Sequence, residues 1–272
     1  MAAVLPATTV ATSSFFDRAL PWSARAWFGV AVLGQWLFAA YILVVFGGAL
    51  VQGQPEAINR TDLITGYVAG DGSGNAMLFG HVLAGALLSA GGVLQLLPWL
   101  RQRLPTVHRW NGRVFLLLAI AGAISGLLLT WVRGSRLSEV TAWALSLDGL
   151  LILIAAGMAW RLAVQRRFAA HRRWAIRAFL LVSAVWAMRL GFMAWVILNQ
   201  GPRGMTTRLD GPFDLFWAFG CFLLPLAIAE LYFLAERHAS WRGPATVVLT
   251  LGAAVSALGV FGAYTMMWAP HL

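Results

Sequence analysis

Seven long apolar stretches constrain the fold of this chain more than any other feature. A helix that crosses a lipid bilayer needs roughly 20 consecutive, mostly apolar residues. Seven segments meet this requirement: 27–51, 77–100, 114–132, 142–160, 174–198, 213–235 and 245–268. Only 11% of the residues are charged, against about one quarter in ordinary soluble proteins. The sequence therefore predicts an all-α polytopic membrane bundle of about seven transmembrane helices, with a single membrane domain over 27–268.

The 20 basic side chains other than histidine are all arginine, and most lie in alternate loops. The loops between spans two and three and between spans four and five contain no acidic residue; their arginines are Arg101, Arg103, Arg109, Arg113, Arg161, Arg166, Arg167, Arg172 and Arg173. Because short arginine-rich loops stay in the cytoplasm, we expect a bacterial inner-membrane protein with its N-terminus inside and its C-terminus outside. The lipid bilayer is the expected partner. Nucleic acid is excluded, because no aqueous domain remains to carry a basic surface.

The segments that flank the first span are polar. Residues 1–26 are expected to form a flexible cytoplasmic tail without a removable signal peptide, since they lack a basic start and a cleavage site. Residues 52–76 form the longest external loop, and their glycine-rich composition is typical of either a lid or a mobile connector. Cys221 is the only cysteine and lies in an apolar run, so no intramolecular disulfide is possible.

Two similar motifs mark the arginine-rich ends of spans three and five. HRWNGR begins at His108 and HRRWAIRAF begins at His171, and both lead into an apolar run. Together with His81 and with Arg189 in AMRL, they resemble the bacterial membrane-protein family known as domain of unknown function 2306. The resemblance covers spans two to five and implies a membrane protein with a four-helix core. It implies no established activity and no catalytic role for any residue.

Ionisable residues inside membrane spans usually mark a function or a partner. Counted by helical rise, Asp148, Arg189 and His81 fall in the outer half of the bilayer. An Asp148–Arg189 ion pair with His81 nearby would be a structural salt bridge, a polar ligand site or part of a proton path. Glu230 is expected to pair with Arg177 or Arg113.

The histidines suggest a further possibility. Transmembrane cytochromes b hold haem between diagonal helices of a four-helix core through two imidazoles at one depth. His108 and His171 are candidate axial ligands of this kind, and the adjacent Arg109, Arg113, Arg172 and Arg173 are candidates to pair with haem propionates or with lipid headgroups. The alternative is that both histidines lie at the lipid interface. His81 would belong to an outer haem, but span four offers Asp148 in place of the second histidine.

Three hypotheses about function follow from these residues. The first is a haem-b-binding electron-transfer module with His108 and His171 as its only metal ligands, and with quinone or another membrane redox protein as its partner. The second is a non-enzymatic accessory or ligand-binding subunit that needs no cofactor and uses Asp148, Arg189 and His81. The third is a proton-linked small-molecule transporter, although the inverted repeats and interrupted helices of transporters are not evident in the sequence.

Overall fold

The computed structural model describes residues 15–61, 66–136 and 138–272, and all regular secondary structure in these ranges is helical, with no strand. The long helices are α1 (Phe15–Ile42), α3 (Gly72–Gln95), α5 (Pro105–Trp131), α6 (Glu139–Val164), α9 (Pro212–Arg237) and α10 (Arg242–Ala263). Two shorter helices, α7 (Phe168–Val182) and α8 (Ala184–Leu198), follow each other directly. The remaining elements are α2 (Gly48–Val51), α4 (Pro98–Arg103), the π-helices η1 (Leu43–Gly47) and η4 (Tyr264–Trp268), and the 3-10 turns η2 (Pro55–Thr61), η3 (Ala239–Trp241) and η5 (Ala269–His271).

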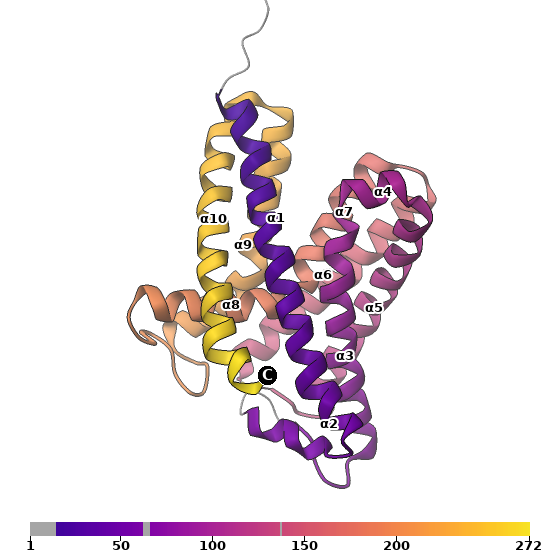
Figure 1. Ribbon diagram of the computed structural model, residues 1–272, viewed down its shortest axis with the longest axis vertical. Helices are drawn as coiled ribbons and strands as arrows, with labels where there is room; N and C mark the ends of the chain where they lie inside the picture. Colours follow the sequence, from indigo (N-terminus) through magenta and orange to yellow (C-terminus); the bar gives the residue numbers. More distant parts are fainter. Residues whose placement is uncertain (1–14, 62–65, 137) are drawn as a thin grey trace, which may run out of the picture.

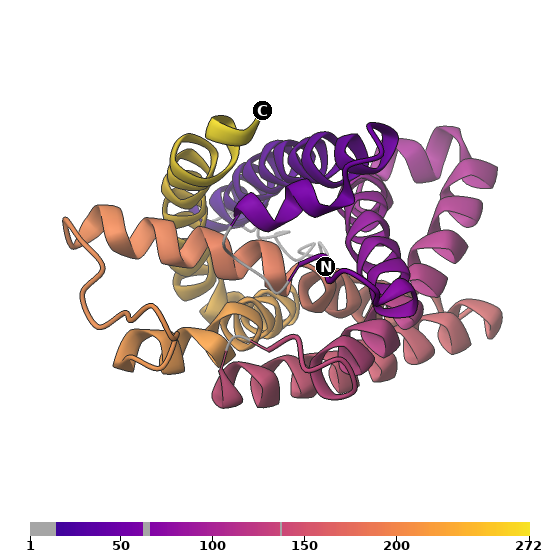
Figure 2. The ribbon, with the colours of Figure 1, turned by 90° about the horizontal axis from the view of Figure 1, so that it is seen from below.

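The long helices confirm the predicted membrane class. Within the described ranges, six helical segments are long and apolar enough to cross a bilayer, and the count becomes seven when α7 and α8 form one span. The seven segments pack in a ring in the order α10, α1, α3, α5, α6, α7 and α9, as Figure 2 shows along the helix axes. Apolar side chains of α3, α5, α6, α7, α8 and α9 fill one continuous core.

The fifth span is broken at Ser183, where α7 and α8 meet at an angle of 57°. Ser183 has non-helical backbone angles, and its hydroxyl donates to the carbonyl of Phe179, a bond that bends helices. The same hydroxyl accepts a 2.9 Å hydrogen bond from Nε2 of Gln35 on α1, and both side chains are buried. This interrupted helix was not evident in the sequence, because a polar contact between distant segments lies at the break.

Helix α8 is packed tightly between α9 and α10, and Figure 1 shows it crossing the direction of the long helices. Gly191 of α8 faces the indole of Trp217 on α9, whose Nε1 donates to the carbonyl of Met188. On the other side, Gly259 of α10 lies against the backbone of Leu190. Small residues at helix crossings let backbones approach closely in lipid, and here they let a bent helix fit inside the bundle.

The arginine-rich loops lie at one end of the molecule, together with the start of α1 (Figure 1). We call this the arginine-rich end, and the end that carries the C-terminus the opposite end. Helix α1 begins at Phe15 rather than at 27, because Asp17 forms an ion pair with Arg242 and Leu20 packs against α9 and α10. The second half of the expected tail is thus helical, and its first 14 residues lie outside the described ranges.

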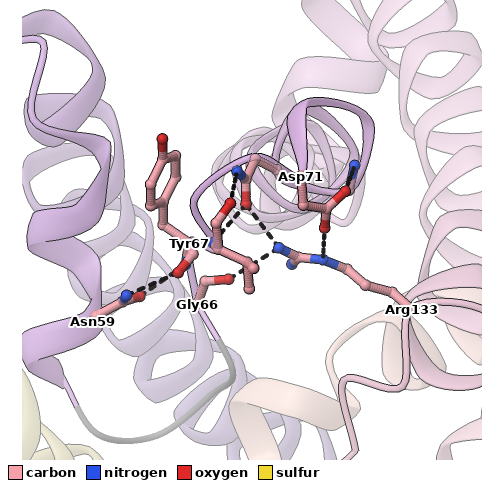
Figure 3. Close-up of polar contacts among 8 residues, drawn as sticks. Asn59, Gly66, Tyr67, Asp71 and Arg133 are labelled. Carbon is pink, nitrogen blue, oxygen red and sulfur yellow. Dashed lines mark hydrogen bonds and ion pairs between the residues drawn. The ribbon is translucent and has the colours of Figure 1, made fainter.

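The described parts of the 52–76 loop are held by side-chain hydrogen bonds at the opposite end (Figure 3). Arg133, which follows α5, has a buried side chain that donates to Asp71 Oδ2 at 2.9 Å, Asn75 Oδ1 at 2.7 Å and the carbonyl of Gly66 at 3.1 Å. The guanidinium of Arg133 holds the pKa of the Asp71 carboxyl below its usual value. Asn59 and Tyr67 exchange two further hydrogen bonds. The loop is therefore fastened to the ends of α3 and α5.

Candidate functional site

The two motif histidines lie in the first turns of α5 and α7, at the arginine-rich end. Nδ1 of His171 is 2.9 Å from the carbonyl oxygen of Ala159 on α6. Because a carbonyl only accepts, Nδ1 donates this bond, which fixes the tautomer and leaves the lone pair of Nε2 free. Histidines that bind metals are usually oriented in this way, by a carbonyl or carboxylate on the other ring nitrogen.

The imidazole of His108 is half-buried, and its Nδ1 is a buried atom without a hydrogen-bond partner. The rings of His108 and His171 lie within range of electrostatic interaction, and Arg101 acts on His108 from the short helix α4. The two histidines therefore lie at the same end of diagonal helices, close enough to interact electrostatically, and their joint role as haem ligands stays a prediction. Arg101 was not among the predicted site residues, although it precedes His108 by only seven residues.

The rest of the first motif packs α5 against α3. Asn111 Nδ2 donates to the carbonyl of Gly91 at 2.9 Å, and Gln95 Nε2 donates to the carbonyl of His108 at 3.1 Å. Gly112 lies beside the Gln95 side chain, in a gap that leaves little room for a larger residue. These contacts fix the height and rotation of the helix turn that carries His108.

The second motif joins α7 to α9. Arg177 forms a bidentate ion pair with Glu230, with distances of 2.6 and 2.9 Å, which confirms one of the two predicted partners. Arg172 pairs with Glu236, and Arg173 lies over the ring of Phe233. These two arginines therefore contact α9, and their expected role towards headgroups or a cofactor stays a prediction.

Arg109 and Arg113 keep exposed side chains at the arginine-rich end. Among the described residues, Arg109 bonds to Thr106 on its own helix, at 3.3 Å, and Arg113 lies over the ring of Trp110. No carboxylate neutralises either guanidinium within the described residues. Both remain available to an anionic group near His108.

Two phenylalanines lie deeper in the bundle than the histidines. Phe115 and Phe179 both lie against Gly92 of α3, so that side chains of α5 and α7 meet there. They follow His108 and His171 by about two helical turns, or roughly 10 to 12 Å at 1.5 Å per residue. Apolar side chains thus fill the bundle about two turns inside the histidines, and arginines lie at the surface beside them.

The predicted cluster of Asp148, Arg189 and His81 is not formed. Asp148 is 5% exposed, has a buried oxygen without a partner, and has Cys221 of α9 as its electrostatic neighbour. Arg189 points to α1, and His81 bonds to Ser125 on α5 at 2.9 Å. The prediction was wrong because equal depth does not imply a shared face, and the break at Ser183 turns α8 away from α6. No group of three or more metal-ligating side chains occurs in the described part of the chain.

The fold and this site define a polytopic α-helical membrane protein with two partly buried histidines at the arginine-rich end of its core. The family model described as "Predicted membrane protein (DUF2306)" matches residues 78–233, which is more than half of the chain. The chain belongs to this family. The match extends beyond the resemblance seen in the sequence and includes most of α9. No curated protein and no solved structure matches the chain.

Proposed function

We propose that the protein binds one haem b between His108 and His171 and transfers electrons within the bacterial inner membrane. One observation carries the proposal: two imidazoles at the same end of diagonal helices lie within electrostatic range of each other. Nδ1 of His108 has no hydrogen-bond partner, and the bond from Nδ1 of His171 to Ala159 leaves Nε2 of His171 free. Buried polar atoms without a partner are rare and call for a ligand.

The surrounding residues fit a haem group. His171 is oriented by Ala159 and would offer Nε2 as an axial ligand, while His108 would supply the second imidazole. Arg109 and Arg101 lie on the side where propionates would reach the surface, and Phe115 and Phe179 bound the apolar side. A bound haem b supplies one-electron transfer, with a potential that depends on its axial ligands and its burial.

The proposal places the site near the cytoplasmic face, with the N-terminus inside and the C-terminus outside. Support comes from the arginines, which gather at the end of the molecule that also carries His108 and His171 (Figure 1). An electron donor or acceptor would approach there, either as a quinone in the inner leaflet or as another membrane redox protein.

The test is a visible absorption spectrum of the protein purified from haem-replete cells. We expect a Soret band and reduced α and β bands after dithionite in the wild type. His108→Ala and His171→Ala should abolish them, whereas His238→Ala, an exposed histidine at the same end, should not. His81→Ala should also leave one haem in place, because His81 already bonds to Ser125. A colourless wild type would end the proposal.

A second candidate function, proton-linked transport, is favoured by the broken span. Interrupted helices in transporters lie next to substrate and ion sites, and Asp148 is a buried carboxyl without a cation. In proteoliposomes with an internal pH dye, an imposed pH gradient should decay faster with the wild type than with Asp148→Asn. Equal decay, at the rate of empty liposomes, would exclude this candidate.

A further inference from the structure

Helices α1 and α8 and the π-helix η4 meet at one face of α1, near the opposite end of the bundle. Gly34, Phe38 and Tyr41 share this face at helical spacing. The indole of Trp186 on α8 packs against Gly34, and the ring of Trp268 in η4 lies 5.5 Å from that of Phe38 and 6.3 Å from that of Tyr41. These aromatic side chains belong to one buried cluster.

A guanidinium without a counter-ion lies on this face. Arg189 is over the ring of Phe38, at 5.2 Å from its centroid, and Nη1 donates to the carbonyl of Val185 at 2.9 Å. None of the five ion pairs among the described residues includes Arg189. Arginine stays charged in proteins, and a charge inside a membrane span needs compensation. One backbone bond and one aromatic face leave most of its donors unused.

Two of the neighbouring polar atoms are donors only, while the hydroxyl of Tyr41, the electrostatic neighbour of Arg189, can both donate and accept. Nε1 of Trp186 and Nε1 of Trp268 are buried and have no hydrogen-bond partner, in residues that are 5% and 1% exposed. Trp186 precedes Arg189 by one turn of α8, and Trp268 lies beside the phenylalanine that Arg189 covers. Since indole and guanidinium groups donate but do not accept, this cluster lacks an acceptor with negative charge.

The backbone irregularities of the chain build this arrangement. The bend at Ser183 directs α8 across the bundle towards α1, which brings Trp186 and Arg189 to this face. The π-helix η4 ends at Trp268 and widens the last turn of the C-terminal helix. Such π-segments occur often at functional sites.

We propose that Arg189, Trp186 and Trp268 form a binding site for an anionic group, a phosphate or a carboxylate, between α1, α8 and η4. The group belongs either to a lipid headgroup or to a small solute. This site is separate from the histidine pair, so its test does not depend on whether haem binds.

Thermal unfolding of the delipidated, detergent-purified protein tests the site, followed by circular dichroism at constant ionic strength. The added probes are inorganic phosphate, acetate and phosphatidylglycerol, with diacylglycerol as the uncharged control. We expect an anionic probe to raise the melting temperature of the wild type by about 5 °C, as ligand binding to the folded state does. Stabilisation by phosphatidylglycerol alone identifies a lipid headgroup, and stabilisation by phosphate or acetate identifies a solute.

Arg189→Gln should abolish the shift, and Arg136→Gln, at an exposed arginine paired with Glu139, should retain it. If Arg189→Gln fails to fold, the double variant Trp186→Phe with Trp268→Phe keeps the rings, removes both N–H donors and should reduce the shift. No shift with any anion in the wild type, or an equal shift in Arg189→Gln, would overturn the proposal. The haem spectrum should be unchanged in all these variants.

Discussion

Gly259 is the position on α10 where one added carbon atom would most disturb the packing of α8. A Cβ at this position would lie 2.5 Å from the carbonyl oxygen of Leu190 and 2.8 Å from its Cβ. Ordinary contacts of a Cβ begin at 3.4 Å, so α8 would have to move by about 0.9 Å. Both atoms belong to the main chain or the Cβ of α8, so no flexible side chain can move aside. Helix α8 itself cannot move easily, because Gly191 already lies against Trp217 of α9.

The expected cost of Gly259→Ala follows from this geometry. Overpacking of a well-packed interior costs about 1 to 3 kcal/mol, and the better helix propensity of alanine returns about 0.5 to 1 kcal/mol. The two ranges leave a net loss of about 0 to 2.5 kcal/mol in the free energy of unfolding. Because the contact of 2.5 Å is severe, we expect a value in the upper half of this range, or a melting temperature lower by roughly 5 °C.

The matched control is Gly252→Ala on the same helix, where the added carbon would meet only the Ile228 side chain at 4.0 Å. This variant should be as stable as the wild type or slightly more stable. The assay is thermal unfolding in detergent, followed by circular dichroism for all three proteins. Equal stability of the two variants would refute the close contact of α8 with α10, and with it the bend that turns Arg189 towards α1.

Three further predictions concern polar contacts between distant segments. Arg133→Gln should lower the free energy of unfolding by about 2 kcal/mol, since it removes charge-assisted bonds, and should speed proteolysis of the 52–71 loop. The control Arg136→Gln, whose ion pair is exposed, should lower it by less than about 0.5 kcal/mol. Because the pKa of Asp71 is lowered in the folded protein, its carboxylate stabilises the fold above pH 3.8, and this contribution is lost as the pH falls further. Asp71→Asn should therefore flatten the acid limb of a plot of melting temperature against pH. An unchanged acid limb would contradict the contact between Asp71 and Arg133. Gln35→Leu and Ser183→Ala should each destabilise by about 1 kcal/mol and the double variant by less than their sum, whereas strict additivity would show that the two side chains do not interact.

Some site residues could be predicted because their position follows from local sequence. His108 and His171 each begin a helix at the arginine-rich end, so their common level followed from topology alone. The Arg177–Glu230 pair was accessible for the same reason, since both residues lie about two turns inside their helices. The sequence could not predict which face of a helix a residue occupies, and the Asp148–Arg189 pair failed on that point.

The sequence by itself determined that the protein resides in a lipid bilayer, that it is helical, and at which end its arginines lie. These properties follow from runs of apolar residues and from charges in short loops, both of which act along the chain. Only the tertiary structure decided the break at Ser183 and the partners of Arg189, Trp186 and Trp268. The reason is that these features depend on contacts between α1, α8 and η4, which lie far apart in the sequence and meet only when the ring of helices closes.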